Sequence, residues 1–118
     1  MKKINLAITG CLGKMGQQLI KSSKNNKDFK IVTLTESRII PKKVSGIKLE
    51  LNNIIAFKKA NVIIDFTVPK CTLQVLKIAS KLKKRVVIGT TGFSKKEERL
   101  IKKFSRKIHI LKLSLIHI

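Results

Sequence analysis

The fold is decided by residues 4–16, which read INLAITGCLGKMG. The apolar run from Ile4 to Thr9 is typical of a β-strand. The glycines after it are spaced G-x-x-G-x-x-G, a variant of the dinucleotide fingerprint G-x-G-x-x-G. Gly10 permits a tight turn, Gly13 lets a pyrophosphate approach the backbone, and Gly16 lets a helix pack closely. The stretch predicts a strand, a phosphate-binding loop and a helix start, the alternative being a plain glycine-rich turn.

The rest of the chain alternates short apolar runs with amphipathic ones. Strand patterns recur at residues 29–35, 62–66, 85–89 and 108–111. Helical spacing recurs at residues 14–23, 54–59 and 72–82, and a capping box at residues 94–97 begins a further helix. Residues 36–53 have no clean period, so we expect a loop there. Short all-apolar strands alternating with helices predict an α/β fold, a Rossmann-like doubly wound parallel sheet.

The charge balance raises a second hypothesis, nucleic-acid binding. The chain has 27 Lys and Arg against 6 Asp and Glu, a net charge of +21. The lysines are scattered rather than grouped, and neither Trp nor Tyr is present to stack on bases. We therefore expect no specific nucleic-acid partner. Cys11 and Cys71 lack metal-site spacing, so we expect no metal.

The location of the protein is predicted from the absence of targeting signals. No apolar run approaches the ~20 residues that span a bilayer. The start of the chain also lacks the pattern of a secretory signal. We expect a cytoplasmic protein without a membrane partner.

Glu36 is the second element of the predicted nucleotide site. It stands at the end of the second predicted strand, twenty residues beyond Gly16. A carboxylate there can accept hydrogen bonds from the adenosine ribose, which favours NAD, whereas Arg38 could meet a 2′-phosphate. NADH and NADPH both remain open as cofactors. The alternative is that Glu36 is only a solvated carboxylate at a strand end.

Two further motifs, IDFTVP at residues 64–69 and VIGTTGF at residues 87–93, follow the loop. Together with it they make residues 4–112 resemble the dihydrodipicolinate reductases (4-hydroxy-tetrahydrodipicolinate reductases) of bacterial lysine, or diaminopimelate, biosynthesis. The resemblance implies an oxidoreductase that uses NADH or NADPH to reduce a small dicarboxylate to tetrahydrodipicolinate.

The resemblance also implies which residues bind the cofactor. The loop residues would wrap the pyrophosphate: Gly10, Cys11, Leu12, Gly13, Lys14 and Met15. Glu36 would hold the adenosine ribose. The remaining residues would lie along the cofactor cleft and the nicotinamide end: Phe66, Thr67, Gly89, Thr90 and Thr91. All three motifs fall at predicted carboxyl ends of strands, where ligands bind in parallel sheets. Asp65, within the second motif, is interpreted as structural rather than catalytic.

The resemblance ends after Lys112. The family continues there into an Asn-Phe-Ser or Asn-Met-Ser type segment, whereas residues 113–118 read LSLIHI. We therefore expect a truncated dinucleotide-binding domain at residues 1–112 and an atypical tail at residues 113–118, for which one interpretation is a non-native end.

We accordingly expect the family's substrate domain, its catalytic residues and its homo-oligomeric assembly to be absent from this chain. We expect such a fragment to bind cofactor without catalysis and to be marginally stable. The alternative is a stand-alone nucleotide-binding regulatory module.

Overall fold

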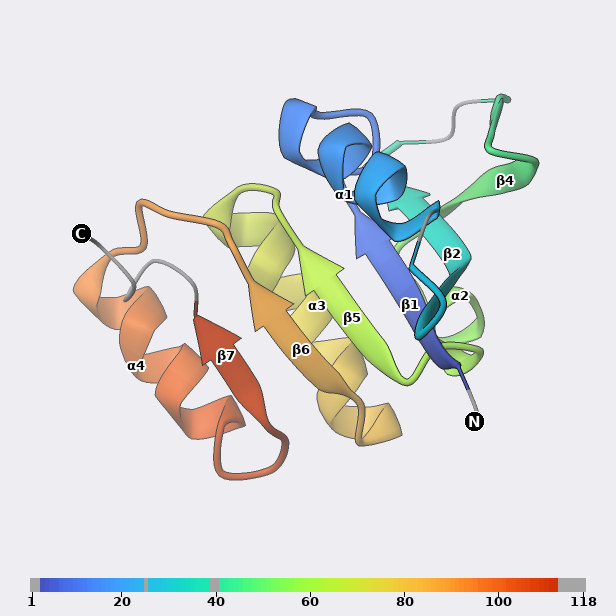
Figure 1. Ribbon diagram of the computed structural model, residues 1–118. Coiled ribbons are helices and arrows are strands. Elements are labelled where there is room, and N and C mark those ends of the chain that lie inside the picture. Colours follow the sequence, from blue (N-terminus) through green and yellow to red (C-terminus); the bar gives the residue numbers. More distant parts are fainter. Residues whose placement is uncertain (1–2, 25, 39–40, 113–118) are drawn as a thin grey trace.

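A seven-stranded sheet forms the centre of the protein (Figure 1). The computed structural model describes residues 3–24, 26–38 and 41–112, so the predicted tail at 113–118 lies outside the described residues. The strands are β1 (Ile4–Thr9), β2 (Phe29–Glu36), β3 (Lys43–Val44), β4 (Ile47–Leu51), β5 (Val62–Asp65), β6 (Arg85–Ile88) and β7 (Ile110–Lys112). The helices are α1 (Lys14–Lys24), α2 (Ile54–Lys58), α3 (Pro69–Leu82) and α4 (Lys95–Phe104).

The strand order is β3-β4-β2-β1-β5-β6-β7, and every pair except β3–β4 is parallel. The chain leaves β1 toward β2 on one side, and β5 then pairs with the other side of β1. This reversal creates a crevice at the carboxyl ends of β1 and β5, the place where open α/β sheets bind ligands.

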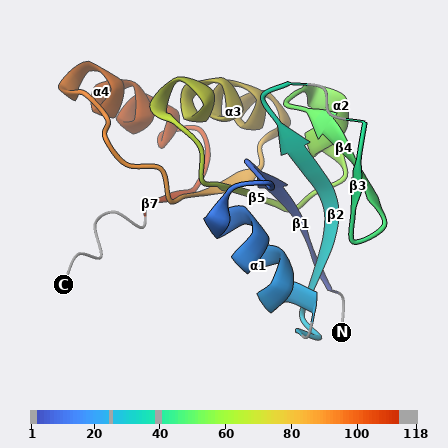
Figure 2. The same cartoon turned by 90° about the horizontal axis from the view of Figure 1, so that it is seen from above.

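The helices cover both faces of the sheet, which confirms the predicted doubly wound class. Figure 2 shows α2, α3 and α4 on one face and α1 on the other. Each face has its own apolar cluster, one containing Phe57, Ile63 and Leu76, the other containing Ile8 and Leu34. No helix in the described residues is long and apolar enough to cross a membrane.

The loop predicted for residues 36–53 is wrong, because this segment contains the β3–β4 hairpin. Ser45 and Gly46 connect the two strands with φ angles of 54° and 79°, the left-handed pair that a two-residue type I′ turn requires. The signal was the Ser-Gly dipeptide between Val44 and Ile47, which pair across the turn. The short strands hide this pattern because they are too brief to show a period.

Two elements begin two or three residues away from the predicted start. α3 begins at Pro69 rather than Thr72, since proline is favoured in the first helical turn, where its missing N–H is not needed. β7 begins at Ile110, two residues later than predicted, although the preceding Ile108 is buried.

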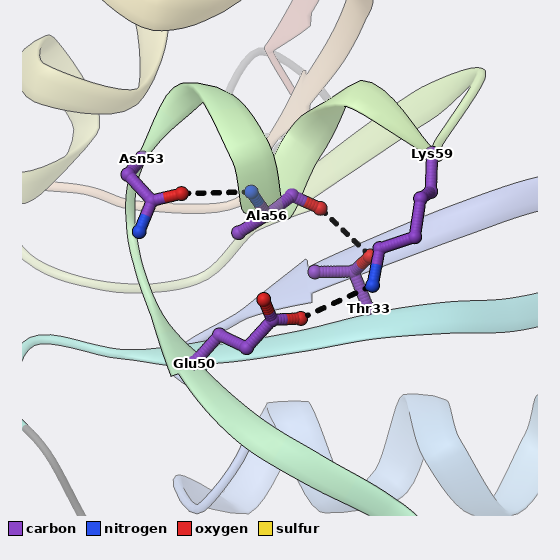
Figure 3. A network of polar contacts seen from close by, with 5 residues as sticks. All are labelled: Thr33, Glu50, Asn53, Ala56 and Lys59. Atoms are coloured by element: carbon purple, nitrogen blue, oxygen red, sulfur yellow. Dashed lines mark hydrogen bonds and ion pairs between the residues drawn. The ribbon is translucent and has the colours of Figure 1, made fainter.

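Short-range polar contacts hold α2 against the sheet (Figure 3). The Asn53 side chain caps the helix by accepting a hydrogen bond from the Ala56 N–H at 2.7 Å. The buried Thr33 hydroxyl of β2 donates to the Ala56 carbonyl at 2.8 Å. An exposed ion pair joins Lys59 to Glu50 at 3.4 Å. These contacts fix a helix too short to be stable by itself.

On the face of the sheet that carries α1, none of the described helices covers the part formed by β5, β6 and β7 (Figure 2). Ile64, Val87 and Leu111 are paired in register across these strands. Their neighbours Ile63, Val86 and Ile110 pack into the α3–α4 cluster. Since side chains alternate along a strand, this apolar row faces the opposite side, and Leu111 is 54% exposed.

We predict that this row causes self-association, because contiguous exposed apolar surface promotes it. Leu111→Thr removes apolar surface while keeping a residue suited to strands. Sedimentation velocity should show a smaller associated fraction at equal concentration. Ile55→Thr is the control, because Ile55 is 77% exposed on α2, far from the row. Equal effects of the two substitutions would contradict the prediction.

Candidate functional site

The turn from β1 into α1 depends on two glycines with no room for a side chain. Gly10 has φ +66°, and a Cβ there would lie 2.8 Å from the Phe66 carbonyl oxygen. A Cβ on Gly16 would overlap the Gly10 carbonyl oxygen and lie 2.7 Å from the Cys11 Cα. Gly16 therefore allows the first turn of α1 to lie directly on the loop, as predicted.

Gly13 differs from these two because protein packing does not require it. A Cβ there would meet only the Gly10 carbonyl oxygen, at 3.4 Å, an ordinary contact. Gly13 is exposed and immediately precedes α1, where free N–H groups and the helix dipole favour an anion. The absent Cβ leaves room on the outer side of the loop, where the sequence predicts a pyrophosphate.

Glu36 ends β2 beside this loop. Its carboxylate accepts a hydrogen bond from the Leu12 N–H at 2.7 Å and is partly buried. This contact places an acidic group at the edge of the phosphate loop, the position from which the sequence predicts a ribose contact. It also fixes the conformation of the loop before any ligand arrives.

Cys11 is part of the core rather than of the loop surface. Its side chain is fully buried, in the cluster with Ile8 and Ile20. Burial raises the pKa of the Cys11 thiol to about 11, and the nearby charge of Glu36 acts in the same direction. Only the backbone of Cys11 can therefore face a ligand. The neighbouring Lys14 and Met15 side chains are exposed.

A groove runs along the carboxyl ends of β1, β2, β4 and β5. Its lining residues are Gly10, Gly13, Glu36, Ser37, Asn52, Phe66, Thr67, Val68 and Cys71. Five of these were predicted from the sequence. Leu12 and Lys14 line a separate hollow between α1 and the β3–β4 hairpin instead.

Asn52 is a groove residue that the sequence reasoning missed. Its side-chain oxygen accepts a hydrogen bond from the Thr35 hydroxyl at 2.5 Å. It follows β4 directly, so it lies at a strand carboxyl end like the predicted residues. The signal would have been a position directly after a strand. It was not seen because no strand was expected before Asn52.

The two motifs after β5 and β6 are in direct contact. A Cβ on Gly89 would overlap the Phe66 ring, so the ring lies against the Gly89 backbone. The Thr67 N–H donates to the Thr90 hydroxyl at 2.9 Å. Thr91 is exposed beyond them. The structure thus joins Phe66, Thr67, Gly89 and Thr90 as one unit beside the groove.

No group of three His, Cys, Asp or Glu side chains capable of holding a metal occurs in the part of the chain that the structure describes. The groove offers one carboxylate, small polar side chains and an aromatic ring, beside the N-terminal turn of α1. Such a set suits an extended ligand with phosphate, hydroxyl and ring components.

Comparison with known proteins matches this chain to one family. The model described as "Dihydrodipicolinate reductase, N-terminus" matches residues 4–114. A 4-hydroxy-tetrahydrodipicolinate reductase of Pelagibacter ubique (strain HTCC1062) is 74% identical over 112 residues, covering 95% of this chain and 43% of the relative. A reductase of the same name from Buchnera aphidicola subsp. Acyrthosiphon pisum (strain Tuc7) is 39% identical over 93% of this chain and 45% of the relative. The chain thus spans less than half the length of these relatives.

Solved structures share the fold. A dipicolinate-bound dihydrodipicolinate reductase from Paenisporosarcina sp. TG-14 matches 88% of this chain and 43% of that chain, with a TM-score of 0.71 and 23% identity. Homoserine dehydrogenase from S. aureus matches 95% of this chain and 32% of that chain, with a TM-score of 0.76 and 19% identity. At these identities the likeness concerns the fold alone.

Because Gly13 and Gly16 have different surroundings, we predict that alanine lowers stability at Gly16 and ligand affinity at Gly13. Gly16→Ala should destabilise the fold by about 1–3 kcal/mol, because the backbone atoms that it meets cannot move aside. This loss exceeds the roughly 0.5–1 kcal/mol by which alanine favours a helix. Gly13→Ala should leave the melting temperature unchanged yet weaken NADH binding at least about tenfold, as expected where a Cβ fills a ligand's place.

Thermal unfolding and a calorimetric titration of NADH measure the two effects. Loss of stability in Gly13→Ala, or unchanged NADH affinity, would show that the loop does not reserve space for a ligand.

Proposed function

The chain belongs to the dihydrodipicolinate reductase family, a family of oxidoreductases, and we propose that it is the part of such a reductase that binds NADH or NADPH. The observation that carries this proposal is the phosphate loop with Glu36 hydrogen-bonded to the Leu12 N–H, at the switch point of the sheet. The unfilled side of Gly13 fits a pyrophosphate there.

In this proposal each end of the groove binds one part of the cofactor. The loop of residues 10–15 wraps the pyrophosphate. The N–H groups of residues 10–13 already donate within the protein, so those of Lys14 and Met15 at the start of α1 donate to the phosphates, favoured by the helix dipole. Glu36 accepts hydrogen bonds from the adenosine ribose hydroxyls. Phe66, Thr67 and residues 89–91 lie against the nicotinamide end. When bound, the cofactor supplies a hydride, and the protein supplies position and electrostatic environment.

We further propose the reaction of the whole enzyme. The hydride passes to an unsaturated dipicolinate-type dicarboxylate and gives tetrahydrodipicolinate, a step of lysine (diaminopimelate) biosynthesis. The supporting observations are the family match and the 74% identity to a reductase of that name. Since the matched region corresponds to 43% of that relative, the substrate, its binding residues and its proton donor are assigned to the whole enzyme rather than to these residues.

We predict that the 118 residues alone bind cofactor without turnover. A spectrophotometric assay of NADH oxidation with the dicarboxylate substrate should give the background rate. A rate tenfold or more above background corresponds to about 1.4 kcal/mol of transition-state stabilisation. Such a rate would contradict the prediction that these residues bind cofactor without catalysis.

We predict that Glu36 sets the preference between NADH and NADPH. Its carboxylate binds ribose hydroxyls and repels a 2′-phosphate, so Glu36→Lys should raise the Kd of NADH about tenfold, the loss of roughly one charge-assisted hydrogen bond. NADPH should lose less affinity than NADH, because the lost Leu12 N–H contact affects both cofactors while the new lysine attracts only the extra phosphate of NADPH.

Glu50→Lys provides the matched control. Glu50 pairs with Lys59 on the surface and does not line the groove. Its replacement by lysine therefore makes the same charge change away from the groove. Titrations of both cofactors should give an NADH-to-NADPH affinity ratio that changes only in Glu36→Lys. An equal change of this ratio in both variants would indicate a general charge effect and contradict the role of Glu36.

A further inference from the structure

Asp65, the last residue of β5, is a fully buried acid. It takes part in neither of the ion pairs found among the described residues. A buried carboxylate without a cation is costly unless hydrogen bonds satisfy it. Its surroundings therefore need an explanation beyond apolar packing.

Four threonine hydroxyls surround the Asp65 carboxylate. Its Oδ1 accepts hydrogen bonds from Thr9 and, at 2.8 Å, from Thr67. Its Oδ2 accepts from Thr72 and, at 3.1 Å, from Thr90. The donors come from β1, the segment after β5, α3 and the segment after β6. One carboxylate thus connects four separate segments of the fold.

The count of protons and lone pairs allows all four hydroxyls to donate to Asp65 at once. An ionised carboxylate has about four acceptor positions, and each threonine has one hydroxyl proton. All four protons can therefore point at Asp65. The Thr90 oxygen, having given its proton, then accepts from the Thr67 N–H at 2.9 Å.

This network lies beside both segments that are proposed to face the cofactor: the phosphate loop, and the unit of Phe66, Thr67, Gly89 and Thr90. Thr9 immediately precedes Gly10 of the phosphate loop. Thr67 and Thr90 belong to the unit proposed to face the nicotinamide end, whereas Asp65 itself does not line the groove. The carboxylate consequently sets the position of the phosphate loop relative to the segments that contain Thr67 and Thr90.

We propose that Asp65 is a positioning residue that holds Thr67 and Thr90 in place for the nicotinamide end of the cofactor. This inference rests on the proposed function. A dinucleotide gains affinity when both of its ends meet loops already in place, because no ordering cost remains at binding. The network supplies this order without touching the ligand.

Asp65→Asn removes one of the two acceptor oxygens of the network. The amide can take either orientation, and its NH₂ group then faces the hydroxyls of Thr9 and Thr67 or those of Thr72 and Thr90. In each orientation one of Thr67 and Thr90 loses its acceptor, so the substitution always disturbs the nicotinamide side. The phosphate loop is reached only through Thr9, which precedes it.

The test compares NADH with ADP-ribose, which keeps the adenosine and pyrophosphate but lacks nicotinamide. Calorimetric or NMR titration of Asp65→Asn should show the Kd of NADH raised about tenfold and that of ADP-ribose changed by less than about threefold, as expected for a lost preorganised contact. A purely structural role would lower the folded fraction and weaken both ligands by the same factor.

Thr72→Val tests the same network without changing its charge. Thr72 is fully buried in the first turn of α3 and does not line the groove, and valine keeps its shape. Thr33→Val is the matched control, because Thr33 is equally buried and its hydroxyl donates a buried hydrogen bond to the Ala56 carbonyl (Figure 3). Thr72→Val should shift the NADH-to-ADP-ribose affinity ratio at least about threefold, and Thr33→Val should leave it unchanged.

The outcomes separate this proposal from the proposed function. If the parent chain binds NADH and ADP-ribose but the ratio stays constant in Asp65→Asn and Thr72→Val, Asp65 has no positioning role. The same conclusion follows if Thr33→Val shifts the ratio as much as Thr72→Val. If the parent chain binds neither ligand, the proposed function fails and the role of Asp65 fails with it.

Discussion

The contact of α1 with the β1 turn is the constraint on which the rest of the structure depends. Because Gly16 has no Cβ, the helix begins against the Gly10 carbonyl, and the chain reverses within a few residues. This sends α1 to one face, while α2, α3 and α4 cover the other (Figure 2). The strand order can then reverse at β1 and β5, and the groove lies at that point.

Features set by local chemistry were predictable from the sequence. β1 has the predicted bounds, and the Ser94–Glu97 capping box forms as expected, because both depend on neighbouring residues alone. The β3–β4 hairpin was missed since its strands pair only after a two-residue turn. The sequence indicated a structural Asp65 but not its partners, because Thr9 and Thr90 meet it only once three strands are aligned.

The strong positive charge does not extend into the groove. Among the described residues that line it, Glu36 alone is charged, despite a net charge of +21 for the chain. Scattered surface lysines attract any phosphate-bearing ligand, and salt screens this attraction. Discrimination between such ligands must come from short-range groups that the surface charge does not supply. The Glu36 carboxylate and the space beside Gly13 are groups of this kind.

The energetics of Asp65 also favour a positional role over a stabilising one. Burying a carboxylate costs several kcal/mol, which its hydrogen bonds must offset. Well-packed apolar residues often replace buried ionic groups without loss of stability. An apolar residue could not orient Thr67 and Thr90, however, since only an acceptor fixes the direction of a hydroxyl. The buried charge is therefore best explained by the geometry it imposes on the groove.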